Sequence, residues 1–176
     1  SLTRGALGLP GIPRITSSSI NFLVFSFILA AVVYFFAYKL VSSKHGKIMQ
    51  AVRDDETAAK VLGKNTQLYK IMSLVISTFM AGIAGSLFAH YITFIDPTIF
   101  SPDILIIVLS MLIVGGLASL NGAVFGAIIV LALSELPRII IVVPALIGPI
   151  RDMTFALLVL IVLIYKPRGL FGKVDL

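Results

Sequence analysis

The chain has 176 residues, of which 59% are hydrophobic and 12% are charged, and its mean hydropathy is +1.08. Soluble domains carry about a quarter of their residues as charged side chains, so this composition excludes an ordinary soluble domain and indicates a membrane protein. The net charge of +6 arises from basic residues that flank apolar runs, which favours the positive-inside bias of membrane proteins over a nucleic-acid-binding surface.

The chain is predicted to begin with a loop and a membrane-spanning helix. Residues 1–19 are rich in Gly, Pro and Ser, and their Pro-Gly-Ile-Pro run cannot continue a helix. Residues 20–41 begin with 19 uncharged residues, which at about 1.5 Å each reach about 28 Å, close to the hydrocarbon thickness of a bilayer. Because the sequence starts with Ser rather than Met, we expect it to be part of a longer protein.

A long polar passage, residues 39–70, follows the first span. It contains half of the chain's fourteen basic residues and a run of three acids that starts at Asp54. Within it, Ala51–Leu62 is predicted to be a helix with Asp54 or Asp55 as its N-cap, and Gly63 suits the left-handed conformation that ends many helices. The passage is either a solvated connector or a helix that docks on a soluble partner, and composition leaves both alternatives open.

The apolar runs after this passage predict four more crossings. The second span is expected to start after Asn65 or Thr66, either of which is a plausible cap. Residues 104–136 fit a tight hairpin of two short helices or one long kinked element, and 137–152, with three prolines, fit an interfacial or re-entrant segment. We therefore predict an all-α, polytopic transmembrane helix bundle, with spans at residues 20–41, 71–95, 104–118, 122–136 and 150–166.

Basic residues predict the orientation of these spans. Residues 39–70 carry seven Lys and Arg and the C-terminal tail carries three, whereas residues 96–103 carry none. Short basic loops stay in the cytoplasm, so both basic segments are expected there and residues 96–103 are expected outside. An even number of crossings must then lie between these outer residues and the last span, which favours the hairpin.

Small residues recur along the predicted spans and would allow close helix packing in lipid. The glycines predicted to serve this role are Gly82, Gly85, Gly115, Gly116, Gly122 and Gly126.

Motifs of catalysis are missing from the sequence. Neither Gly-Lys pair has the context of a phosphate-binding loop, and no Ser has a histidine base within sequence reach. His45 and His90 have no partner at metal-ligand spacing, and we expect His90 to bond a backbone carbonyl near the outer interface. The expectation is therefore a chain without catalytic residues, metal or cofactor, in which any ATP would be hydrolysed by another chain.

The residues around the polar passage resemble a known family. Glu56-Thr57-Ala58-Ala59, followed by three residues and Gly63, resembles the EAA-type loop of bacterial ABC importer permeases. The stretches GKIMQAVRDDETAAKVLGKNTQLYKIMSLVISTFMAGIAGSLFAHY, SPDILIIVLSMLIVGGLASLNGAVFGA and IYKPRGLFG resemble permeases of branched-chain amino acid importers, most closely the M-type subunit.

This resemblance implies that residues 1–176 are the C-terminal part of a permease domain and that residues 42–70 are its cytoplasmic coupling loop. It implies a non-catalytic subunit that translocates Leu, Ile or Val across the bacterial inner membrane. The implied partners are an H-type permease subunit, two ATP-binding subunits and a periplasmic substrate-binding protein. By position in the motif, the residues implied in coupling to the ATPase are Arg53, Asp54, Glu56, Ala59 and Gly63.

Alternative functions stay open at this point. Importers of urea or short-chain amides share the same motifs. An ion-driven secondary carrier would need a carboxylate buried near the middle of the bilayer, and the predicted spans between residues 20 and 134 contain none. A structural anchor for a soluble enzyme would hold a partner through residues 39–70 without any dependence on a substrate.

Overall fold

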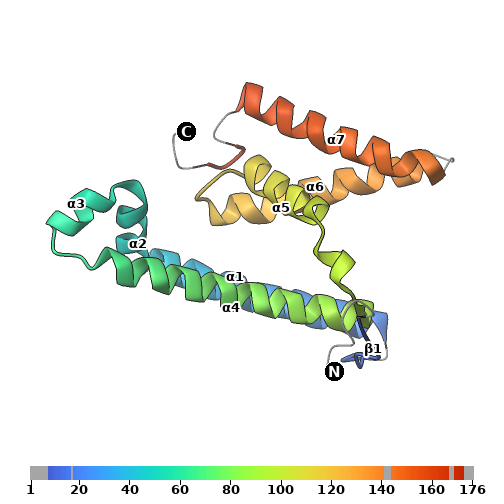
Figure 1. The fold of residues 1–176 in the computed structure, drawn as a ribbon, viewed down its shortest axis with the longest axis horizontal. Helices are drawn as coiled ribbons and strands as arrows, with labels where there is room; N and C mark the ends of the chain where they lie inside the picture. The colour runs from blue at the N-terminus through green and yellow to red at the C-terminus, as the bar shows by residue number, and fades with distance from the viewer. Residues whose placement is uncertain (1–7, 17, 141–143, 167–168, 173–176) are drawn as a thin grey trace. The chain divides into compact units, whose positions relative to one another are not determined.

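The computed structural model describes residues 8–16, 18–140, 144–166 and 169–172, and the predicted all-α class is confirmed for them (Figure 1). The chain divides into two compact units, Ser1–Pro97 and Thr98–Leu176. Among the described residues, two helices are long and apolar enough to cross a membrane, and two shorter apolar stretches lie at Ile104–Gly115 and Leu120–Glu135.

The first unit consists of two long helices whose ends are linked by short elements (Figure 1). Antiparallel pairing of strand β1 with β2 sets Leu9 against Ile95, and the rings of Phe22 and Tyr91 stack with centroids 5.8 Å apart. The start of α1 and the end of α4 therefore lie together, and the polar passage lies at the opposite ends of both helices. The elements are β1 (Leu9–Pro10), α1 (Ser19–Ser42), α2 (Lys44–Asp54), α3 (Glu56–Val61), α4 (Thr66–Ile92) and β2 (Phe94–Ile95).

Helix boundaries in this unit follow their caps. Asn65 caps α4, as one of the two predicted candidates, since its side chain accepts a hydrogen bond from the backbone N–H of Leu68. The helix starts at Thr66, ahead of the apolar span predicted from residue 71. It ends at Ile92 rather than residue 95, because Thr93 adopts a left-handed conformation with φ of 63°. The predicted single helix Ala51–Leu62 is wrong: Asp55 is extended and separates α2 from α3.

The second unit contains a hairpin and a third helix. Its elements are α5 (Pro102–Gly115), α6 (Leu120–Ile140) and α7 (Pro144–Tyr165), and a 3-10 turn at Pro97–Phe100 precedes them. Gly116 and Ala118 have positive φ and form the turn between α5 and α6, so the hairpin alternative is confirmed and the single kinked element is wrong. A core of Val114, Val130 and Phe155 joins all three helices.

The predicted interfacial or re-entrant segment at residues 137–152 is helical where the structure describes it, and its position in the membrane stays a prediction. Helix α6 continues to Ile140 and α7 already begins at Pro144, six residues before the predicted span; residues 141–143 lie outside the described part. Proline is well tolerated at the first position of a helix, where its missing N–H leaves no bond unmade. Pro149 lies inside α7, so the prolines do not interrupt the helix as the sequence suggested.

The segment after α7 returns to the end of α5. The backbone N–H groups of Leu170 and Phe171 donate to the carbonyls of Val114 and Gly115, both at 3.0 Å. These carbonyls belong to the last turn of α5 and have no partner within the helix. The C-terminal ends of α5 and α7 therefore lie on the same side of the second unit.

Candidate coupling site

The polar passage folds into a small helical unit attached to both long helices. Ser43 caps α2, accepting a hydrogen bond from the backbone N–H of Gly46 at 3.1 Å. Gly46 lies directly against the end of α1: a Cβ there would overlap the carbonyl groups of Leu40 and Val41. Val52 of α2 is buried as well. These contacts give α2 a fixed position at the end of α1.

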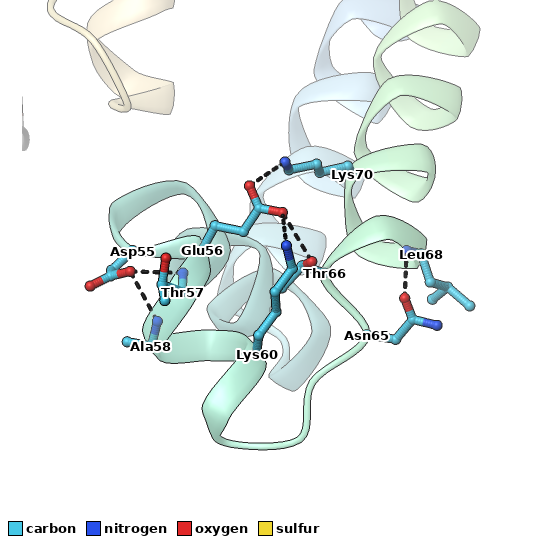
Figure 2. A network of polar contacts seen from close by, with 9 residues as sticks. All are labelled: Asp55, Glu56, Thr57, Ala58, Lys60, Asn65, Thr66, Leu68 and Lys70. Atoms are coloured by element: carbon cyan, nitrogen blue, oxygen red, sulfur yellow. Dashed lines mark hydrogen bonds and ion pairs between the residues drawn. The ribbon is translucent and has the colours of Figure 1, made fainter.

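Helix α3 has only six residues, and its start is held by Asp55. The Asp55 carboxylate accepts hydrogen bonds from the backbone N–H groups of Thr57, at 2.8 Å, and Ala58, at 3.0 Å (Figure 2). A helix this short is not stable on its propensity alone. It depends on this cap, on burial of Ala59, and on the contacts that its first residue makes with α4.

Glu56 connects α3 to the first two turns of α4. Its carboxylate accepts hydrogen bonds from Lys70 Nζ at 2.5 Å and from Thr66 Oγ1 at 3.1 Å, and it forms an ion pair with Lys60 Nζ at 3.0 Å (Figure 2). Thr66 is buried. One carboxylate thus connects two residues of α4 with one of α3.

The same contacts hold the pKa of Glu56 at about 2, well below its ordinary value of 4.5. The hydrogen bond from Lys70 is the largest cause, followed by the one from Lys60, and Thr66 adds a smaller contribution. The Glu56 carboxylate is therefore charged throughout the physiological range.

A lowered pKa means that the network stabilises the loop most when Glu56 is ionised. This stabilisation is complete above about pH 4.5 and is lost as the pH falls toward 2. We expect amide hydrogen exchange in residues 55–66, corrected for the intrinsic pH dependence, to lose protection as the pH falls from about 4.5 to about 2. In Glu56→Gln this loss should disappear; an unchanged loss in that variant would contradict the assignment.

The C-terminal end of α3 presents an apolar tip to solvent. Val61 is 83% exposed and Leu62 is 76% exposed, whereas the other side chains of α3 are small or charged. Gly63 follows in the left-handed conformation, with φ of 73°, and nothing lies within 4 Å of where its Cβ would stand. The short helix α3 is thus held by its cap and by Glu56, and it carries two solvent-exposed aliphatic side chains at its C-terminal end.

The other predicted coupling residues lie apart from this network. Arg53 and Asp54 pair with each other at 2.8 Å at the end of α2, and Asp54 is not the cap. Sequence reasoning left out of the coupling set four side chains that form these contacts: Asp55, Lys60, Thr66 and Lys70. Lys60 follows Glu56 by one helical turn, a spacing that signals an ion pair, but Lys70 is fourteen residues away and carries no such signal.

The glycines predicted for helix packing fall into two groups. Gly115, Gly122 and Gly126 lie where the backbones of α5 and α6 meet, and a Cβ on any of them would overlap the backbone of the facing helix. Gly116 forms the turn between these helices. Gly82 and Gly85 are different, because nothing in the described part of the chain lies within 4 Å of where a Cβ would stand.

The two histidines take no part in a metal site among the residues described. His90 Nδ1 lies 2.7 Å from the carbonyl oxygen of Pro13, which confirms the predicted backbone bond. The His45 ring lies 6.2 Å from that of Tyr69. No group of three potential ligands (His, Cys, Asp or Glu) gathers within the described segments.

Long apolar helices joined by a structured polar loop are typical of an integral membrane protein. A family model described as "Branched-chain amino acid transport system / permease component" matches residues 2–165. The chain therefore belongs to the branched-chain amino acid transport permease family.

Individual relatives agree with this family. The chain is 28% identical to the high-affinity branched-chain amino acid transport system permease protein LivM of Escherichia coli K12, over 88% of this chain and 35% of that protein. It is 27% identical to the probable LivM permease of Methanocaldococcus jannaschii, over 95% of this chain and 52% of the relative. The chain is also 28% identical to the LivH permease of Salmonella typhimurium LT2, over 90% of this chain and 48% of that protein.

The chain thus spans between about a third and about a half of the length of these curated relatives. No solved structure matches it.

Proposed function

We propose that this chain is the C-terminal part of the permease subunit of an ABC importer that carries Leu, Ile or Val across the bacterial inner membrane. On this proposal it has no catalytic residue and binds no cofactor, and a separate ATP-binding subunit supplies the energy. The permease would work with a related H-type permease subunit, two ATP-binding subunits and a periplasmic substrate-binding protein. The relatives, which are named as branched-chain amino acid permeases, support the substrate class.

One observation carries the coupling role: the exposed apolar tip of α3. Val61 and Leu62 lie in the most charged passage of the chain, so lipid does not account for their exposure. Exposed aliphatic side chains on a firmly held short helix are typical of a protein-docking surface. The occupant we propose is the ATP-binding subunit, because a coupling element must contact the energy source and the spans together.

The Glu56 network would transmit force from this tip to the membrane. A movement of the docked α3 pulls on Lys70 and Thr66 through one carboxylate, and both residues belong to the first two turns of α4. Since α4 is a continuous helix to Ile92, displacement at its cytoplasmic end would tilt the whole span as a rigid body. Arg53, Asp54, Ala59 and Gly63 would shape the loop around this connection.

The proposed topology has five crossings, formed by α1, α4, α5, α6 and α7, with residues 42–70 and the C-terminus in the cytoplasm. Two features of the fold support it. The pairing of β1 with β2 lies at the ends of α1 and α4 opposite the basic loop. The bonds from Leu170 and Phe171 to the end of α5 leave α5 and α7 pointing the same way, as two outward-to-inward crossings should.

Site-directed labelling tests this placement. The 176 residues contain no cysteine, so a cysteine introduced in a cysteine-free complex is a unique label. We expect Lys64→Cys to react with a membrane-impermeant maleimide only from the cytoplasmic side and the control Phe100→Cys only from outside. Labelling of Lys64→Cys from outside, or an active complex purified without an ATP-hydrolysing subunit, would overturn the proposal.

A further inference from the structure

A cleft of about 400 Å³ lies in the first unit, at the end opposite the coupling loop. It is formed by the loop that precedes α1, the first turn of α1 and the last turn of α4. The lining residues are Arg14, Thr16, Ser19, Phe22, His90 and Tyr91. Its volume falls in the range of small-molecule sites, about 300–1,000 Å³.

The cleft has a defined frame. The bond between His90 and the carbonyl of Pro13 fixes the loop to the end of α4. The backbone N–H of Ile12 also donates to the carbonyl of Thr93, at 3.2 Å, and the β1–β2 pairing continues this connection. The walls of the cleft are therefore held in place by bonds between residues that lie about eighty positions apart in the chain.

Its polar groups are suited to an anion. Within the described residues no carboxylate pairs with Arg14, and no acidic side chain lines the cleft. The Thr16 hydroxyl is shielded from solvent, yet it has no hydrogen-bond partner among those residues. A shielded hydroxyl without a partner is costly, and it gains most from a ligand that supplies an acceptor.

Two of the lining residues are aromatic. Phe22 and Tyr91 stack with their ring planes 27° apart, one from each long helix. Such a pair offers an aromatic surface to an aliphatic group, and its ring faces also attract an ammonium group. The cleft thus combines a cation and a free donor with an aromatic wall.

We propose that this cleft binds a small aliphatic carboxylate of the amino acid class. Arg14 and Thr16 would bind the carboxylate, Phe22 and Tyr91 would contact the aliphatic side chain, and His90 would position the loop. The choice of an amino acid and the outward placement of the cleft rest on the proposed function. The carboxylate preference rests on the side chains alone.

Direct binding to the purified full-length permease complex, without nucleotide or binding protein, tests this site. Radiolabelled L-leucine and 4-methylpentanoate are the probes. We expect Arg14→Gln to raise the dissociation constant of both by about tenfold or more, because a charge-assisted hydrogen bond is lost. Arg14→Lys, which keeps the charge but loses the planar fork, should weaken binding less. Lys39→Gln, at the far end of α1, removes one positive charge outside the cleft and should bind as the unmodified complex does.

Competition defines the chemistry. L-Leucinamide, which lacks the carboxylate, should not displace either probe, and inorganic phosphate should not displace them at the same concentration. Unchanged binding in Arg14→Gln, no binding to the unmodified complex, or equal displacement by phosphate would each overturn the proposal. A failure of the proposed function would give a different result. The complex would take up urea instead of leucine, while its binding of 4-methylpentanoate would still depend on Arg14.

Discussion

Leu62→Asp is expected to reduce ATP-driven leucine uptake by the complete transporter at least about tenfold while the permease stays in the membrane. The side chain is 76% exposed at the tip of α3, so the change costs little in the isolated loop. In an apolar contact with the ATP-binding subunit, however, the carboxylate would be buried without a partner. Buried contacts at the centre of an interface commonly contribute about 2 kcal/mol or more, which corresponds to more than tenfold in affinity. Val61→Asp should act in the same direction.

The measurement is uptake of radiolabelled leucine together with the amount of ATP-binding subunit that co-purifies in detergent. Gln67→Asp is a matched control, because it adds the same charge to the same loop on an exposed position in the first turn of α4. An acid there is favoured by the helix dipole, and the position belongs to α4 rather than to the apolar tip of α3. Full uptake and normal co-purification in Leu62→Asp would show that the tip is not the docking surface.

The long helices of this fold are predictable because their signals are local. Helix α1 differs by one residue at each end from the span expected from its apolar run. Both Asn65 and Asp55 act as N-caps, and a short polar side chain just before a helix predicts such a cap. The left-handed conformation of Gly63 also follows from its place after the last turn of α3.

The features that local signals do not contain are those that depend on tertiary contacts. Asp55 was one of two candidate caps within an expected continuous helix. Its extended backbone breaks the chain into two helices, and the contacts of Glu56 with Lys70 and Thr66 hold the second of them against α4. The early start of α7 is similar: prolines ordinarily mark a helix boundary, yet Pro144 opens the helix and Pro149 lies within it.

The glycines illustrate the same limit. Sequence spacing treats Gly82, Gly85 and Gly126 alike, since each belongs to a set of small residues in an apolar run. The structure separates them, because among these three only Gly126 faces another backbone within the described residues. The spacing of small residues predicts that a second helix can pack closely against this one, but it does not identify that second helix.

Gly126→Leu is therefore expected to prevent stable folding of the second unit. A Cβ at this position would overlap the carbonyl oxygen of Met111 and would lie 2.6 Å from the backbone nitrogen of Gly115. These atoms belong to the backbone of α5, so no side-chain rotation relieves the overlap and the two helices must separate. Separation would open the core around Val114 and Val130, both almost fully buried. Overpacking ordinarily costs about 1–3 kcal/mol, and we expect a larger loss here because backbone must move.

Thermal stability of the detergent-purified complex and the amount of permease in the membrane measure this effect. Gly82→Leu is the matched control: the same substitution on α4, where nothing in the described chain lies within 4 Å of the Cβ. Gly82→Leu should leave membrane insertion unchanged. If this variant alone failed to assemble into the complex, that result would indicate that a helix of a partner subunit packs against α4. Gly126→Ala should be destabilising too, because the Cβ itself makes the overlap. If Gly126→Leu accumulates and melts like Gly82→Leu, the close approach of α5 and α6 does not hold the second unit together.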